Sequence, residues 1–362
     1  MSESSLHCNH TAAGATFVDV FDWSLPGHYG DVTAEYEVVR GGAGIVDLSH
    51  RGKICMTGGD RQAFLHRIVT NEIRALNPGD GTYACMLTPQ GKIISDMTVY
   101  VSEDHLLLDT ESGMVPVLME TLDRYALMDD VVMEDATEQW ALIGVVGPMA
   151  MEILGGLSMS IRELAYLQHV MSDFQGQTVM AVRSHRTAET SYDVYVKADQ
   201  AEAFWNALLE QGGKRIGLEV MEILRIEAGI PRYGAELDER IIPNEAVRER
   251  AVSFQKGCYV GQEPVVMMEH RGRPNRMLTG LKIDGDTLPA KDAVLKKDGQ
   301  DAGWITSTVH GKAVDGVLAL AFVRRKYMNV GDRLTVETSG VTKKAEIVPL
   351  PFVLAKEQGH GT

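Results

Sequence analysis

The sequence predicts an α+β protein in which two units of alternating strands and helices precede a small antiparallel barrel. Over residues 51–137, runs typical of strands alternate with runs whose apolar residues recur every three or four positions. A similar order of elements recurs over residues 140–230, so each unit resembles a split βαβ, ferredoxin-like arrangement. From Met277 onward, short alternating runs are separated by Gly and Asp turns, which is typical of a barrel or sandwich.

Each unit can be divided into its expected elements in order. In the first, strands are expected at 53–57, 82–87, 93–101, 106–108 and 131–133, with helices near 61–73 and 112–125. In the second, strands are expected at 140–146, 178–183 and 192–196, with a helix opened by Pro148 and another from Asp199 to Gly212. The predicted division is a tail at 1–26, a region at 27–272 with an inserted unit at about 51–137, and a barrel domain at 277–354.

Composition limits the class of protein. The 362 residues carry a formal charge of −15, which argues against a broad nucleic-acid surface. No run of 18 apolar residues occurs, so no membrane span is expected. The four cysteines are far apart and form no C-x-x-C pair, which fits a reducing, cytoplasmic compartment. Cys8 and His10 are expected to lie in a disordered tail rather than to form a metal site, and no other metal site is predicted.

Four residues could carry chemistry. Asp96 lies within the expected strand 93–101, where aspartate is disfavoured, so it belongs either to a solvated sheet face or to a pocket. Glu189 precedes the strand at 192–196, and its default interpretation is a solvated loop carboxylate. Arg225 has close apolar neighbours, so an ion pair with Glu222 or Glu227 is as well supported as ligand binding.

Cys258 is the fourth candidate, within Lys256-Gly257-Cys258-Tyr259-Val260-Gly261-Gln262-Glu263. Lys256 could favour its thiolate, but a single cysteine is as often an inert apolar residue. This octapeptide resembles the signature of the YgfZ folate-binding proteins, relatives of the glycine cleavage T-protein (aminomethyltransferase). T-proteins carry an aspartate where this chain has Cys258.

The resemblance to the T-protein superfamily extends over nearly the whole chain. It is carried by the segments 28–36, 43–49, 88–96 and 224–231 and by the C-terminal segments 302–307 and 350–352. It implies a three-domain cloverleaf around a central tetrahydrofolate pocket. Asp96 matches the acidic position beside the reactive folate nitrogens, Tyr83 a folate-contacting tyrosine, Glu189 the pterin-binding glutamate, and Arg225 an arginine near the site. The chain departs from the family in lacking the tyrosine before Thr187 and in having Asp109 where asparagine is usual.

Two functions are compatible with this resemblance. One is a tetrahydrofolate-dependent one-carbon transferase, in which Asp96 acts on a folate amine and the donor is a lipoylated carrier protein or a small methyl donor. The other is a folate-binding factor that supports iron–sulfur proteins through Cys258. A monomer is expected in both cases.

Overall fold

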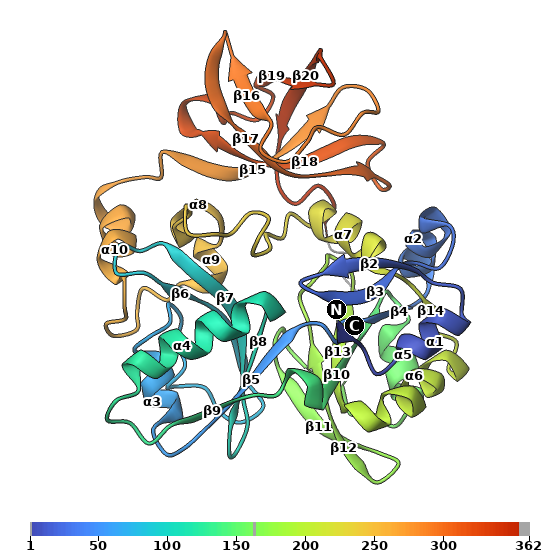
Figure 1. Ribbon diagram of the computed structural model, residues 1–362. Helices are drawn as coiled ribbons and strands as arrows, with labels where there is room; N and C mark the ends of the chain where they lie inside the picture. The colour runs from blue at the N-terminus through green and yellow to red at the C-terminus, as the bar shows by residue number, and fades with distance from the viewer. Residues whose placement is uncertain (1, 162–163, 355–362) are drawn as a thin grey trace, which may run out of the picture.

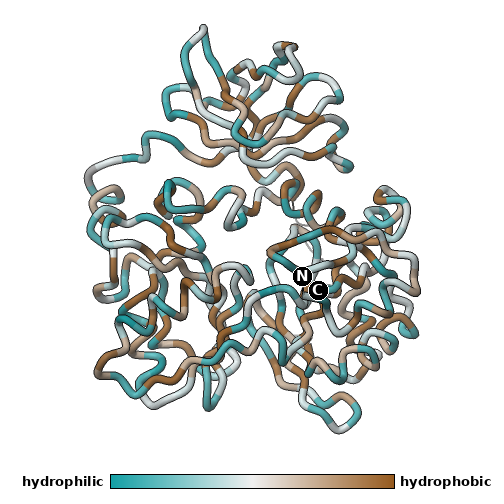
Figure 2. Tube along the Cα trace, in the orientation of Figure 1, coloured by the Kyte–Doolittle hydropathy of each residue, from teal (hydrophilic) through white to brown (hydrophobic). Residues whose placement is uncertain are grey.

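The computed structural model describes residues 2–161 and 164–354, which form three lobes around a shared centre (Figure 1). Two lobes are built on β-sheets covered by helices, and the third is a closed barrel. Apolar residues gather along the inner strands of each lobe (Figure 2). The predicted fold class, two α+β units and a C-terminal antiparallel barrel, is confirmed.

The N-terminal segment is folded, so the prediction of a disordered tail is wrong for residues 2–26. Strands β1 (Ser2–Glu3), β2 (Thr16–Val20) and β3 (Trp23–His28) form a sheet of order β1-β3-β2, and helix α1 (His7–Ala12) follows β1. His10 on α1 is fully buried. Its ring nitrogens lie 2.9 Å from Asp47 Oδ2 and 2.7 Å from the Tyr29 hydroxyl. This buried polar contact orders the segment.

The first lobe contains a five-stranded antiparallel sheet of order β6-β7-β8-β5-β9. Its strands are β5 (Gly52–Thr57), β6 (Gly81–Leu87), β7 (Ile93–Val101), β8 (Leu106–Thr110) and β9 (Val132–Asp135). Helix α3 (Arg61–His66) follows β5, and α4 (Val115–Tyr125) follows a 3-10 turn, η1 (Ser112–Met114). The helices bury apolar side chains such as Phe64 and Leu118 in one core with the sheet.

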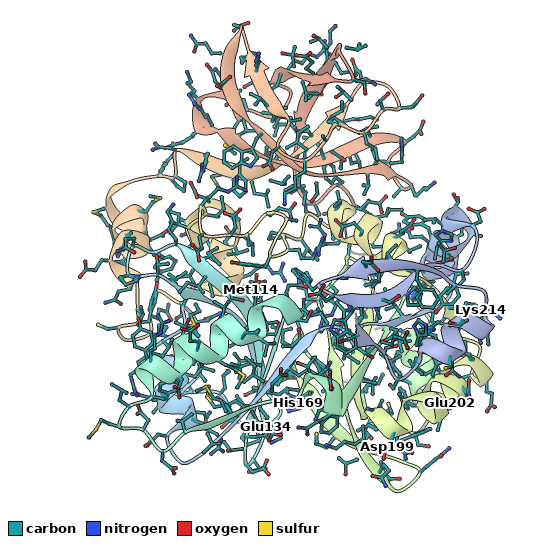
Figure 3. The ribbon with its side chains drawn as sticks, in the orientation of Figure 1. Met114, Glu134, His169, Asp199, Glu202 and Lys214 are labelled. Carbon is teal, nitrogen blue, oxygen red and sulfur yellow. The ribbon has the colours of Figure 1, made fainter. Side chains whose placement is uncertain are left out.

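The second lobe contains a six-stranded sheet of order β11-β12-β13-β10-β4-β14. Its strands are β4 (Gly44–Asp47), β10 (Trp140–Val146), β11 (His169–Phe174), β12 (Gln177–Arg183), β13 (Ser191–Lys197) and β14 (Lys214–Arg215). Its helices are α2 (Val32–Gly41), α5 (Ala150–Gly156), α6 (Ala201–Glu210) and α7 (Leu218–Glu227), with 3-10 turns η2 (Thr137–Gln139) and η3 (Ala198–Gln200). Glu202 and Lys214 lie at the outer edge of this lobe, away from the first (Figure 3).

Strands β4 and β10 are hydrogen-bonded neighbours, although the whole first sheet lies between them in sequence. The chain therefore leaves the second lobe after β4, builds the first lobe and returns through β10. This connection brings the two sheets together at the centre of the molecule.

The third lobe is a closed barrel of order β15-β18-β17-β16-β19-β20. Its strands are β15 (Arg276–Ile283), β16 (Val294–Lys297), β17 (Gln300–Gly311), β18 (Gly316–Arg324), β19 (Arg333–Thr338) and β20 (Val341–Val348), with a 3-10 turn η4 (Arg325–Tyr327). Three helices lie on the path from α7 to the barrel: α8 (Pro243–Ala246), α9 (Arg248–Ala251) and α10 (Gln262–Arg271). No helix in the described part of the chain is long and apolar enough to cross a membrane.

The buried contact of His10 generates a stability prediction. His10→Ala should lower the free energy of unfolding by about 3 kcal/mol, because it leaves the fully buried Asp47 carboxylate without its imidazole partner. Urea unfolding followed by circular dichroism measures the change. The matched control is His7→Ala, because His7 lies on the same helix. Its one acidic neighbour among the described residues is the exposed Glu3, with 3.6 Å between His7 Nε2 and Glu3 Oε1, and such a surface contact contributes less than about 1 kcal/mol. If both substitutions lower the free energy of unfolding by the same small amount, the contact between His10 and Asp47 does not stabilise the fold as described.

Candidate functional site

A cavity of about 390 Å³ lies at the centre, where both sheets, α7 and the chain leading to the barrel meet. Its wall includes Tyr83 from β6, Asp96 from β7, Asp193 from β13, Arg225 from α7 and Arg250 from α9. Such a volume is typical of a small-molecule site. Strands of both sheets contribute polar side chains to the cavity, among them Tyr83, Asp96 and Asp193, so the connection through β4 and β10 helps to position the site.

Tyr83 and Asp96 form a hydrogen-bonded pair in the cavity wall. They project from neighbouring antiparallel strands, and the Tyr83 hydroxyl donates to Asp96 Oδ2 at 2.8 Å. Asp96 Oδ1 is buried and has no hydrogen-bond partner among the residues described. Burial raises the pKa of Asp96 above its ordinary value. The site thus contains a carboxyl group with one free oxygen and an increased affinity for a proton.

Glu189 does not share this cavity, contrary to the expectation that Tyr83, Asp96 and Glu189 line one pocket. It is buried and forms an ion pair with Arg40 of α2. It is not among the residues that line the central cavity. The ion pair with Arg40 occupies the Glu189 carboxylate outside the cavity.

The carboxylate that the second sheet contributes to the cavity wall is that of Asp193. The sequence analysis does not predict this residue. Asp193 lies within β13 and accepts a hydrogen bond of 2.6 Å from Arg186 Nε. The signal was present, since aspartate is disfavoured within strands here as it is at Asp96. The cavity therefore has a carboxylate from each sheet.

Asp109 on β8 joins the two sheets behind this wall. Its Oδ1 accepts from Arg51 Nε at 2.8 Å, and its Oδ2 accepts from Arg186 Nη2 at 2.9 Å and from the Tyr195 hydroxyl at 2.5 Å. Burial alone would raise the pKa of Asp109, but Arg51 and Arg186 outweigh it and hold the pKa below its usual range. Arg51 also pairs with Glu111. Both arginines are held in place by carboxylates.

Arg225 lines the cavity, but every donor of its guanidinium group already has a partner. Nε and Nη2 donate to Glu222 at 2.9 and 2.5 Å. Nη1 donates to Glu236 at 2.8 Å and to the Ile230 carbonyl at 2.7 Å, and Nη2 also donates to Ser307 Oγ at 3.0 Å. Of the two ion-pair partners left open by the sequence, Glu222 is the one observed. In the structure, Arg225 connects α7 to the barrel through its hydrogen bond to Ser307.

Two histidines add neutral imidazoles to the wall. His50 and His185 line the cavity, and the Nδ1 atom of each is buried without a partner in the described ranges. Burial lowers the pKa of each to about 4. Near neutral pH they contribute hydrogen-bonding groups rather than charge.

Cys258 lies outside the cavity, at an exposed position before α10. The ammonium group of Lys256 donates to the carbonyls of Val69 and Asn71 at 2.6 and 2.8 Å and also to that of His66. It therefore acts on the backbone of the first lobe. The described residues contain no group of three or more metal-ligating side chains. A catalytic role for Cys258 stays a prediction.

Comparison with known proteins agrees with this architecture. The family model of the GCVT N-terminal domain matches residues 6–256, and that of the glycine cleavage T-protein C-terminal barrel domain matches residues 276–353. A curated aminomethyltransferase of Desulfitobacterium hafniense is 30% identical over 365 residues, covering 99% of each chain. One of Cutibacterium acnes is 32% identical over 359 residues, covering 95% of this chain and 96% of the relative.

The fold is also that of a solved structure. The crystal structure of glycine cleavage system aminomethyltransferase T from Bartonella henselae superposes with a TM-score of 0.91 at 24% identity, covering 98% of this chain and 99% of that one. These matches do not favour the YgfZ-type alternative. The two family models together span both sheets and the barrel, and the chain belongs to the glycine cleavage T-protein (aminomethyltransferase) family.

Proposed function

We propose that this protein is a tetrahydrofolate-dependent one-carbon transferase whose reaction takes place in the central cavity. The observation that carries the proposal is the Asp96 carboxyl, with one oxygen bound to Tyr83 and the other buried without a partner among the described side chains. A buried polar atom without a partner costs free energy unless a ligand satisfies it. The membership of the chain in an aminomethyltransferase family supports the same conclusion.

The cavity residues fit a reduced pterin. The edge of a pterin ring presents N–H donors, and Asp96 Oδ1 and the carboxylate of Asp193 offer acceptors on opposite sheets. Leu48, Leu167 and Met221 supply apolar surface for the flat ring. Residues of both sheets would thus hold the ring between them.

Asp96 has the properties that the proton transfer needs. Bound tetrahydrofolate would supply the amine that takes over the one-carbon unit. Asp96 would accept the hydrogen of that amine at Oδ1 and remove the proton as the new C–N bond forms. It would then return that proton to the leaving ammonia as the bond between the carbon and the ammonia nitrogen breaks. With an aminomethylated lipoyl donor, a second amine of the folate then bonds to the same carbon as the C–S bond breaks, and the proton of that amine ends on the lipoyl thiol. Tyr83 would hold the carboxyl in place through Oδ2.

Two donors are compatible with this chemistry: an aminomethyl group on a lipoylated carrier protein and a small N-methyl compound. The test is to incubate the purified protein with tetrahydrofolate and aminomethylated lipoyl carrier, and to measure methylenetetrahydrofolate and ammonia. Formation of both products supports the transferase. A protein that neither binds tetrahydrofolate nor turns over either donor would overturn the proposal.

Asp96→Asn should lower kcat by about 10²- to 10⁴-fold, because the proton acceptor is lost. The change in tetrahydrofolate affinity should be small beside this, about tenfold or less, because the shape and an oxygen that accepts a hydrogen bond are kept. Because the pKa of Asp96 is raised, wild-type kcat should fall on the acidic side at a pH above the ordinary aspartate value of about 4. Below that pKa Asp96 is protonated and inactive as a base. Steady-state kinetics from pH 4 to 8 measure both effects. Wild-type turnover in the variant would exclude Asp96 from the mechanism.

Asp193→Asn should weaken tetrahydrofolate binding by about tenfold, the loss expected for one charged hydrogen bond. Glu189→Gln is the matched control, because that carboxylate lies on the same segment but pairs with Arg40 outside the cavity. Calorimetric titration of both variants with tetrahydrofolate measures the difference. A larger loss for Glu189→Gln would restore Glu189 as the pterin ligand and remove Asp193.

Cys258→Ala should leave one-carbon transfer intact, because the thiol lies outside the cavity. In the wild type, Cys258 should react with iodoacetamide faster than the partly buried Cys55 and the buried Cys85, as mass spectrometry of timed samples would show. Loss of transfer in a folded variant would contradict this prediction and place the thiol in the transfer reaction.

A further inference from the structure

The cavity contains five arginines, and they differ in how many of their donors are already used. Arg51 and Arg186 are held by Asp109 and its neighbouring carboxylates, and Arg225 has no donor left. Arg232 is partly exposed, with Nε 3.8 Å from Glu222. Each of these four has an acidic side chain within ion-pair distance.

Arg250 is the exception. Within residues 2–161 and 164–354, its guanidinium makes no ion pair and no hydrogen bond, and it lies over the face of the Tyr83 ring, 5.3 Å from Cζ to the ring centre. The side chain lines the cavity and is partly buried. In a chain with a formal charge of −15, a cation without an acidic partner inside a cavity calls for an explanation.

The backbone beneath this side chain is fixed. Asn71 Nδ2 donates to the Arg250 carbonyl at 3.2 Å and to the Tyr83 carbonyl at 2.9 Å. Thr70 Oγ1 donates to the carbonyl of Ala251 at 2.6 Å. The backbone of Arg250 is therefore held at a set position relative to that of Tyr83, and the guanidinium lies over the Tyr83 ring.

We propose that Arg250 is the carboxylate-binding residue of the central cavity. A carboxylate can accept two parallel hydrogen bonds from one guanidinium group, and none of the donors of Arg250 is committed to the protein. Since the guanidinium lies over Tyr83, whose hydroxyl holds Asp96, an anchored carboxylate would direct the rest of the ligand toward Asp96. This inference rests on the proposed function. The carboxylate belongs either to the glutamate of folate or to the one-carbon donor.

The test compares Arg250→Gln and Arg250→Lys with the wild type. The matched control is Arg248→Gln, because Arg248 lies on the same short helix but pairs with Glu269 and does not line the cavity. Calorimetry is carried out with tetrahydrofolate and with 6-methyltetrahydropterin, which has the same ring and no carboxylate. For the donor, dimethylglycine is compared with dimethylethylamine, which differs from it by the carboxylate. Circular dichroism confirms that each variant is folded.

If the carboxylate is that of folate, Arg250→Gln weakens tetrahydrofolate binding about tenfold or more and leaves 6-methyltetrahydropterin binding unchanged. If it is that of the donor, both pterins bind as in the wild type and only the preference for dimethylglycine over dimethylethylamine is lost. Arg250→Lys recovers part of either effect, and Arg248→Gln shows neither. Unchanged binding of all four compounds in Arg250→Gln would overturn the inference alone. A wild-type protein that binds neither pterin would overturn the proposed function, and the inference with it.

Discussion

The central cavity depends on one buried carboxylate, Asp109. It lies on β8 of the first sheet and accepts hydrogen bonds from Arg186 and Tyr195 of the second lobe. Arg51, which enters from the link between β4 and β5, completes the cluster. Removing one member of such a buried cluster leaves an uncompensated charge, at a cost of about 3–5 kcal/mol. The same cost opposes any sliding of one sheet against the other, so the spacing of Asp96 and Asp193 across the cavity is set by this contact.

Arg225 connects α7 to the barrel by hydrogen bonds, as Asp109 connects the two sheets. It joins Glu222 on α7 to Ser307 on β17, and Glu236 accepts hydrogen bonds from both Arg225 and Ser307, the latter at 2.5 Å. Most of the charged groups in the cavity wall are thus paired with one another. Besides the neutral imidazoles of His50 and His185, two groups in this wall have no partner among the described residues: the Oδ1 atom of Asp96 and the guanidinium of Arg250, and both of these side chains contact Tyr83. Groups that the fold leaves unsatisfied are those available to a ligand.

How far the sequence predicts this structure depends on the range of the interactions involved. The bounds of β7 and β10 agree with prediction because two-residue alternation and apolar runs are local signals. The folded segment before α2 escaped prediction because its order comes from His10 and Asp47, 37 residues apart. The pocket carboxylate was assigned to Glu189 rather than Asp193 because a motif match gives a position in the chain. The register of β13 against β10 places the Asp193 side chain, and the ion pair with Arg40 holds that of Glu189. A short motif contains neither interaction.

The octapeptide around Cys258 can be understood in the same terms. Gly261 has a φ of +75°, and a Cβ there would lie 2.2 Å from the Thr88 carbonyl, so only glycine lets this loop approach the β6–β7 hairpin. Lys256 satisfies carbonyl groups that follow α3, and Tyr259 is buried beside Cys85 and Leu87 of β6. Several of the residues that make this segment recognisable therefore support the hairpin that carries Tyr83 and Asp96. Because Cys258 itself is exposed and takes no part in that packing, its side chain is free to differ between relatives without disturbing the cavity.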